Sequence, residues 1–137
     1  MILIETDILL ALISVKDRHH KEALKIVDRF RGRTVLSPYS LLELDLIIMS
    51  GKILIRDIFS FYQSLSTLLD YRRIKIIPPK PSYHAEANKL RKRYEKLTYF
   101  DSLHAAVSLS EKLEHVSYDS IYEGIEELNY VHPSKYV

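Results

Sequence analysis

The sequence predicts an α/β domain in which helices cover both faces of a short parallel sheet. Short apolar runs at 2–5, 34–36, 74–77 and 115–118 have the length and composition of buried strands. Longer segments with apolar residues at helical spacing separate these runs. Because strands that alternate with helices pair in parallel, the pattern indicates one sheet between two helical layers.

The first half of the chain is predicted to contain three helices. Residues 8–15 stay apolar after the first strand and are expected to turn helical, and 19–30 carries apolar residues at helical spacing. Ser37 is the predicted N-cap of the next helix, with Pro38 in its first turn. Gly51 is expected to end that helix.

The second half continues the alternation. A helix is predicted over 56–71, and Ser82 is expected to cap a helix that reaches about Lys96. Asp101 is predicted to begin a helix through Leu113. A short helix at 121–127 and a weak strand at 130–131 complete the chain.

Length and composition favour one globular domain over residues 1–137. Hydrophobic residues make up 47% and charged residues 28%, which excludes a disordered chain. Cysteine is absent, which excludes disulfides, thiolate zinc sites and cysteine nucleophiles and fits a reducing cytoplasm. The N-terminus meets Glu5 too early for a signal peptide, and charges interrupt the apolar stretch 41–55, so no membrane association is expected.

The net charge of +2 does not by itself indicate a nucleic-acid partner. Basic residues nevertheless cluster in three places, at 29–33, 72–75 and 89–96. Such clusters are more often solvated helix faces and strand entries than binding sites, and that interpretation is favoured here.

Five acidic residues differ from the rest because apolar neighbours flank them. They are Glu5, Asp7, Glu43, Asp101 and Asp119. Each has an ordinary structural interpretation when taken alone. Asp101 and Asp119 suit N-caps, Glu43 suits the first turn of a helix, and Glu5 suits a sheet edge.

The joint placement of these acids points to a site. Glu5, Asp7 and Asp119 follow strands, whereas Glu43 and Asp101 begin helices. Ligands of open parallel sheets bind beyond the carboxyl ends of the strands, where these side chains are expected to converge. Converging carboxylates repel one another unless a cation neutralises them, and oxygen ligands suit Mg²⁺ or Mn²⁺. The chemistry that such a site supports is metal-assisted hydrolysis of a phosphodiester.

Five segments carry a more specific pattern, at 5–12, 17–23, 37–44, 99–106 and 117–119. The segment 99–106, which places an aspartate before Ser-Leu-His-Ala-Ala, is the most distinctive. In this order and at these spacings, the whole chain resembles the PIN-domain ribonucleases, and specifically the VapC-type toxins of toxin–antitoxin pairs. The resemblance implies a three-layer α/β/α fold with about five parallel strands in the order 3-2-1-4-5.

The resemblance also implies roles for the acids. Asp101 and Asp119 would be metal ligands together with Glu5 or Asp7, and Glu43 would bind a second ion or orient a water. Thr6 and Ser117 would hydrogen-bond a carboxylate or a water. His104 lies one turn after Asp101 and is interpreted as a packing or interface residue.

One departure from the family pattern affects the metal ligands. Glu5 stands where the family has aspartate, and Asp7 stands where it has asparagine or serine. Residues two apart in an extended chain point the same way, so both side chains are kept as candidates. The shorter Asp7 is slightly favoured as the ligand.

Three functions remain open. The first is a Mg²⁺- or Mn²⁺-dependent endoribonuclease toxin with an antitoxin protein partner, and the resemblance also implies a homodimer. The second is a housekeeping nuclease of the same fold that processes RNA. The third is a PIN-like module that binds RNA or protein without cutting, which the departure at Glu5 suggests. Tyr39 or Tyr99 could stack on unpaired bases of an RNA substrate, but aromatic residues in such patterns more often belong to the core.

Overall fold

The computed structural model describes residues 1–137, which form a five-stranded parallel sheet in the order β3-β2-β1-β4-β5. The predicted strand order is therefore confirmed. The strands are β1 (Ile2–Ile4), β2 (Thr34–Leu36), β3 (Ile74–Ile76), β4 (Glu114–Val116) and β5 (Tyr130–Val131). Ile4 at the end of β1 pairs with Leu36 on one side and Val116 on the other. The carboxyl ends of the three central strands therefore lie level at one edge of the sheet.

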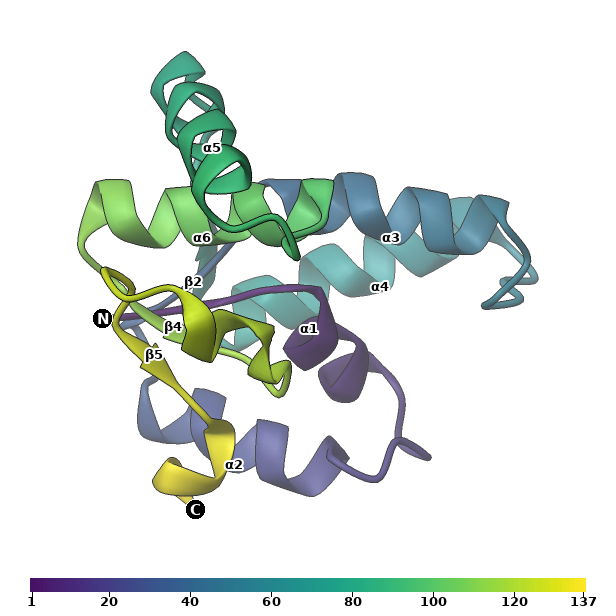
Figure 1. The fold of residues 1–137 in the computed structure, drawn as a ribbon. Coiled ribbons are helices and arrows are strands. Elements are labelled where there is room, and N and C mark those ends of the chain that lie inside the picture. The colour runs from purple at the N-terminus through teal and green to yellow at the C-terminus, as the bar shows by residue number, and fades with distance from the viewer.

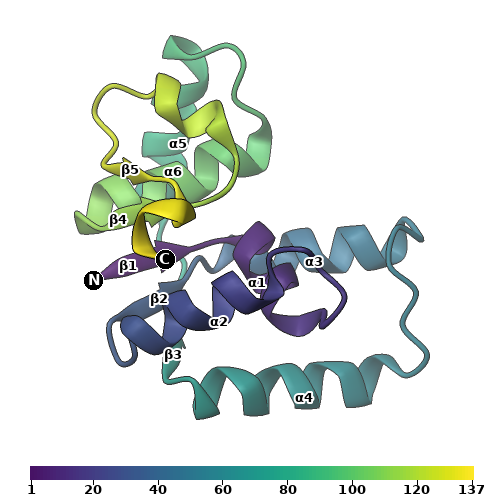
Figure 2. The same ribbon diagram turned by 90° about the horizontal axis from the view of Figure 1, so that it is seen from below.

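Six α-helices and two 3₁₀ helices surround the sheet. The α-helices are α1 (Thr6–Ile13), α2 (His20–Arg29), α3 (Tyr39–Met49), α4 (Ile58–Tyr71), α5 (Pro81–Arg93) and α6 (Tyr99–Glu111), and the 3₁₀ helices are η1 (Ser120–Gly124) and η2 (Pro133–Tyr136). α3 and α4 extend beyond the sheet in the same direction (Figure 1). Figure 2 shows α5 and α6 on one face of the sheet and α2 and α4 on the other, which confirms the three layers. None of the helices combines the length and hydrophobicity that a membrane span requires.

The alternation of side chains along β1 divides the core in two. Ile2 and Ile4 pack in one cluster with buried residues of α1, α2 and α4. Leu3 points to the opposite face and packs with buried residues of α5, α6 and η1. All three side chains are fully buried, and each such burial contributes roughly 1.5–3 kcal/mol. The central strand is thus fixed from both faces, which holds its carboxyl end in place.

Several predicted boundaries differ from the observed ones. Ser82 does not cap α5, because Pro81 occupies the first turn, where its fixed φ angle suits a helix, and Lys80 precedes it. The same helix ends at Arg93 instead of Lys96. α6 begins before Asp101, because the Thr98 hydroxyl accepts a hydrogen bond from the Asp101 amide. The expected helix at 121–127 is the shorter 3₁₀ helix η1.

The start of α3 also differs from the prediction. α3 begins at Tyr39, and Pro38 occupies the N-cap position predicted for Ser37. The Ser37 hydroxyl still accepts a hydrogen bond from the Tyr39 amide, at 3.3 Å. The serine therefore remains near the helix start. Its hydroxyl also contacts Nδ1 of His104, which the capping pattern did not indicate.

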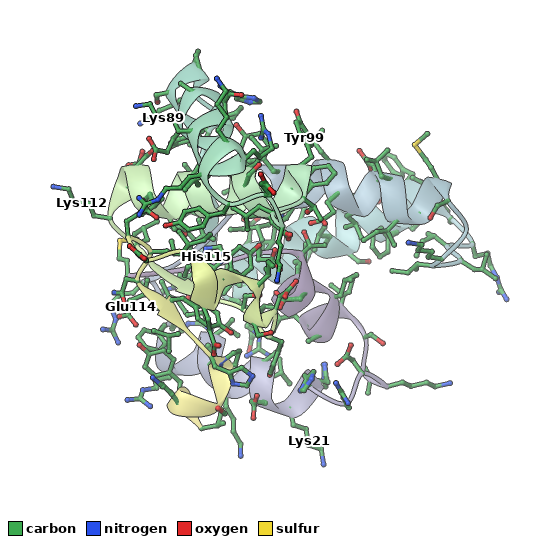
Figure 3. The ribbon with its side chains drawn as sticks, viewed as in Figure 1. Lys21, Lys89, Tyr99, Lys112, Glu114 and His115 are labelled. Atoms are coloured by element: carbon green, nitrogen blue, oxygen red, sulfur yellow. The ribbon has the colours of Figure 1, made fainter.

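Most residues of the basic clusters lie at the surface, as the favoured interpretation predicts. Lys89 on α5 points away from the molecule (Figure 3). Arg72 forms an ion pair with Asp28, and Arg93 forms ion pairs with Glu126 and Glu127. Exposed pairs of this kind contribute little to stability, about 0–1 kcal/mol each.

The packing of α3 yields a prediction about stability. Leu44 is fully buried, whereas Leu46 on the same helix is 52% exposed. We expect Leu44→Ala to lower the free energy of unfolding by about 2–5 kcal/mol, because it removes buried contacts and leaves a cavity. Leu46→Ala is expected to change it by about 0.5 kcal/mol or less. Urea unfolding of the two variants measures the difference, and equal losses would contradict the observed packing of α3.

Candidate active site at the carboxyl end of the sheet

Glu5 is placed by the junction between β1 and α1. It is the N-cap residue of α1, and its Oε1 atom accepts a hydrogen bond from the Asp7 amide at 3.1 Å. Its Oε2 atom accepts a hydrogen bond from the Tyr122 hydroxyl at 3.0 Å. Tyr122 is fully buried on η1, and Glu5 is only 6% exposed. The carboxylate is therefore held at both oxygen atoms beneath the carboxyl edge of the sheet.

The electrostatic environment of Glu5 is unfavourable to its charge. Burial raises the pKa of Glu5 well above its usual value, and the neighbouring charges of Asp7 and Glu43 raise it further. Burial and the charge of Glu5 also raise the pKa of the Tyr122 phenol, so the phenol remains a hydrogen-bond donor. No lysine or arginine forms an ion pair with any of the five predicted site acids. His104 is thus the basic residue that lies within 4.0 Å of these acids, at 2.9 Å from Glu43 and 3.6 Å from Glu5.

Glu43 reaches the same place from α3. Its Oε1 atom accepts hydrogen bonds from the Thr6 hydroxyl and from Nε2 of His104, the latter at 2.9 Å. Burial disfavours ionisation of Glu43, but these two hydrogen bonds outweigh it and lower the pKa. Its Oε2 atom has no hydrogen-bond donor from the protein. Ligand atoms of Glu5, Glu43 and His104 all lie within 4.8 Å of one another.

Asp7, the acid slightly favoured as the metal ligand, lies near Glu5, and both of its carboxylate oxygens accept hydrogen bonds from the protein. Its Oδ1 atom accepts a hydrogen bond from the Ile8 amide at 2.7 Å. Its Oδ2 atom accepts two more, from the Ser117 hydroxyl at 2.8 Å and the Tyr118 amide at 2.7 Å. Asp7 therefore joins the start of α1 to the end of β4, and it is not a member of the compact group of Glu5, Glu43 and His104.

Asp101 and Asp119 both cap helices. Asp101 Oδ2 accepts a hydrogen bond from the Thr98 amide at 3.1 Å, which completes a capping box at the start of α6. Asp119 Oδ1 accepts one from the Ile121 amide at 3.0 Å at the start of η1. The N-cap interpretation is thus confirmed for Asp119, whereas the N-cap of α6 is Thr98 and Asp101 is the N3 residue of its capping box. Each carboxylate keeps one oxygen without a protein donor, so the structural role leaves an oxygen for another ligand.

The structure does not bring all five acids into one compact cluster. Glu5 and Glu43 lie together through His104, whereas Asp101 and Asp119 lie outside the group whose ligand atoms are within 4.8 Å. The charge of Asp101 still acts on Tyr122, which binds Glu5, and raises its pKa after burial and Glu5 itself. Asp119 follows Ser117, the residue that binds Asp7, by two positions. Asp101 is therefore coupled electrostatically to a residue that binds Glu5, whereas Asp119 forms no hydrogen bond with Glu5, Glu43 or His104.

Two residues of the site were missed by the sequence analysis. His104 is fully buried, as a packing residue would be, but it also donates to Glu43. His104 lies three residues after Asp101, so both side chains are on one side of α6. This spacing could have indicated that His104 faces the site. Tyr122 lies three residues after Asp119, and its contact with Glu5 spans 117 positions of the sequence. Only the folded chain reveals that contact.

The two tyrosines considered for base stacking have different environments. Tyr39 is 3% exposed and packs against His84, so it belongs to the core, as the alternative interpretation expects, and it is not available to stack on a base. Tyr99 is 56% exposed at the start of α6, where Figure 3 shows it at the surface. The guanidinium of Arg91 lies 5.3 Å from the centre of the Tyr99 ring and donates to Ser102 at 2.6 Å. Stacking of a base on Tyr99 stays a prediction.

The residues present fit a divalent cation. Carboxylate oxygens without protein donors belong to Glu43, Asp101 and Asp119, and Glu5 is a buried acid whose charge no lysine or arginine balances. Hard ions such as Mg²⁺ and Mn²⁺ prefer such oxygen ligands. A bound cation would offset the repulsion that raises the pKa of Glu5.

The burial of Glu5 yields a prediction for the metal-free protein. Because the pKa of Glu5 is higher in the folded chain than its usual value of 4.5, the unfolded chain releases this proton at lower pH. Stability is therefore lost as the pH rises from about 4.5 through the raised pKa. We expect Glu5→Gln to unfold at a higher temperature than the wild type at pH 7 in EDTA. The difference between the two melting temperatures should decrease as the pH is lowered towards 4. Thermal unfolding at several pH values between 4 and 7 measures this difference. A variant that is less stable than the wild type at every pH would contradict the raised pKa of Glu5.

Comparisons with known proteins agree with this architecture. Three solved structures are similar over nearly the full length of both chains: a toxin–antitoxin complex from Klebsiella pneumoniae (19% identity, TM-score 0.70, 97% of this chain and 98% of the other), FitAcB from Neisseria gonorrhoeae (16%, 0.73, 98% and 99%) and VapBC2 from Rickettsia felis bound to a DNA fragment from its promoter (18%, 0.71, 96% and 98%). At these identities the likeness establishes the fold.

A search of curated protein sequences gives no significant match. The sequence profile of the PIN domain, by contrast, matches residues 2–128, which include all five predicted site acids. The match covers nearly the whole chain and agrees with the strand order and with the position of the acids at the carboxyl edge of the sheet. The chain therefore belongs to the PIN domain family.

Proposed function

We propose that this PIN domain is a Mg²⁺- or Mn²⁺-dependent endoribonuclease. The observation that carries the proposal is the group of acids at the carboxyl edge of the sheet, none of which has a lysine or arginine partner. Such a group is costly unless a cation binds to it. PIN domains are generally nucleases, which agrees with a cation placed where a phosphate can approach.

The proposed ligands are the carboxylates of Glu5, Glu43, Asp101 and Asp119. When bound, the ion would activate water and neutralise charge on the phosphate. Glu5 is preferred to Asp7 here because Asp7 already accepts three hydrogen bonds from Ile8, Ser117 and Tyr118. In this proposal Asp7 acts mainly as the link between α1 and β4.

The residues of the chain would position the carboxylates before any ion binds. Tyr122 and the Asp7 amide hold the two oxygens of Glu5, and Thr6 holds one oxygen of Glu43. Ser117 fixes the Asp7 carboxylate and also accepts from the Asp119 amide at 3.1 Å. These contacts reduce the reorganisation that metal binding would otherwise require.

We further propose that the nuclease is the toxin of a VapBC-type pair and acts in the cytoplasm with an antitoxin partner. The similar structures include a toxin–antitoxin complex from Klebsiella pneumoniae and VapBC2 from Rickettsia felis, which supports the proposal. Large apolar side chains are exposed along α3, α4 and their connection: Leu42, Leu46, Met49, Leu54, Ile58 and Phe59. An exposed apolar set of this extent suits a protein interface, with an antitoxin or with a second copy in a homodimer.

Cleavage of RNA tests the proposed function. We expect the purified protein to cut labelled single-stranded RNA in Mg²⁺ or Mn²⁺ and to lose this activity in EDTA. Asp101→Asn and Asp119→Asn each keep a capping side chain but remove a charged ligand. Each substitution should lower the rate of RNA cleavage by more than about 100-fold. Loss of a residue that only hydrogen-bonds a metal ligand typically lowers activity by roughly 10–100-fold.

A control is available at Asp57, which is the N-cap residue of α4 as Asp119 is the N-cap residue of η1. Asp57→Asn should retain full activity. If folded protein free of any antitoxin shows no metal-dependent cleavage, the chain is instead a non-cutting PIN-like module, and Glu5 is the first residue to examine. Cleavage that is confined to precursor RNAs would favour a housekeeping nuclease.

A further inference from the structure

We propose that His104 is a positioning residue for the metal centre, and that it orients Glu43 as a hydrogen-bond donor without coordinating the ion. The inference rests on the proposed metal site and deepens it. His104 is one of three residues whose ligand atoms lie within 4.8 Å of one another, so it is also a potential ligand through a ring nitrogen. The hydrogen bonds of the imidazole distinguish the two roles.

The Nε2 atom of His104 faces an acceptor. It lies 2.9 Å from Glu43 Oε1 and 3.6 Å from Glu5 Oε2. A carboxylate oxygen accepts but does not donate, so a hydrogen bond at 2.9 Å requires a proton on Nε2. A protonated nitrogen has no lone pair for a metal ion. This nitrogen therefore acts as a donor between the two glutamates.

The other ring nitrogen is occupied by Ser37. Nδ1 of His104 lies 2.7 Å from the Ser37 hydroxyl, and both residues are fully buried. The same hydroxyl oxygen accepts from the Tyr39 amide, and it has no other acceptor for its own proton. The serine therefore donates to Nδ1, which places the ring proton on Nε2. Ser37, at the start of α3, thus selects the tautomer that donates to Glu43.

The consequence concerns the free oxygen of Glu43. Thr6 and His104 both donate to Oε1, which leaves Oε2 as the oxygen without a protein partner. Two donors from α1 and α6 fix the rotation of a carboxylate carried by α3, so that Oε2 is presented in one direction. The ion would then be held by oxygen atoms alone, which favours hard cations.

Binding of Mn²⁺ to the whole protein tests this role. His104→Leu removes the donor while keeping an apolar side chain of similar size, and we expect it to weaken Mn²⁺ affinity by about 10–100-fold, measured by calorimetry. His104→Gln keeps an N–H group near the position of Nε2 and should restore most of that loss. Ser37→Ala should weaken Mn²⁺ binding as well, because the His104 ring would no longer be held in the tautomer that has its proton on Nε2.

Ser108→Ala is the matched control for Ser37→Ala. Ser108 is also buried and lies 2.8 Å from Nδ1 of a buried histidine, His115. The Nε2 atom of His115 has no hydrogen-bond partner, and it therefore orients no carboxylate. We expect Ser108→Ala to cost stability but to leave Mn²⁺ affinity unchanged. Equal losses of affinity in both serine variants would contradict a specific role of Ser37.

Two spectroscopic measurements begin with the wild-type protein. Nitrogen NMR of the metal-free protein should show the proton of His104 on Nε2, and a ring protonated only on Nδ1 would overturn the proposal. Pulsed EPR of the Mn²⁺ complex should show no coupling to a histidine nitrogen, whereas a coupling that disappears in His104→Gln would make His104 a ligand. The NMR result is independent of RNA cleavage and of metal binding, so it separates failure of this inference from failure of the proposed function.

Discussion

The site depends on the repulsion between carboxylates that the fold gathers at one edge of the sheet. A parallel sheet aligns the carboxyl ends of β1, β2 and β4, and the chain places acids at or just beyond these ends. This repulsion is clearest at Glu5, where burial raises the pKa of the carboxyl group and the nearby acids raise it further. The fold tolerates this charge through donors that it aims at each carboxylate, and through the cation that we propose.

The donors divide into two kinds. Those around Asp7 join two elements of the fold, since Ser117 and Tyr118 lie at the end of β4 and Asp7 lies in α1. Those around Glu43, from Thr6 and His104, hold one carboxylate oxygen and leave the other without a donor, whereas Glu5 accepts one hydrogen bond at each oxygen. The first kind suits a structural link and the second suits a binding site. Our preference for Glu5 over Asp7 as a ligand rests on the two hydrogen bonds that Glu5 accepts against the three that Asp7 accepts, although Glu5 departs from the family pattern.

The sequence was sufficient to predict the sheet and the candidate acids, because these depend on local patterns. Apolar runs such as Ile2–Ile4 are recognisable as buried strands, and their alternation with helices determines a parallel topology. The ends of the helices were less predictable, because neighbouring caps compete. Pro81 displaced Ser82 at the start of α5, and Thr98 moved the start of α6 ahead of Asp101. The contacts of His104 and Tyr122 were not predictable, because their partners are 61 and 117 residues away in the chain.

Anomalous diffraction from crystals of the Mn²⁺-loaded protein tests the central claim most directly. The account predicts a manganese peak at the carboxyl edge of the sheet, in direct contact with Glu5 and with Glu43 Oε2 and without a ligand from His104. A peak bound by Asp7 in place of Glu5, a histidine nitrogen among the ligands, or no ordered manganese at this edge would contradict it.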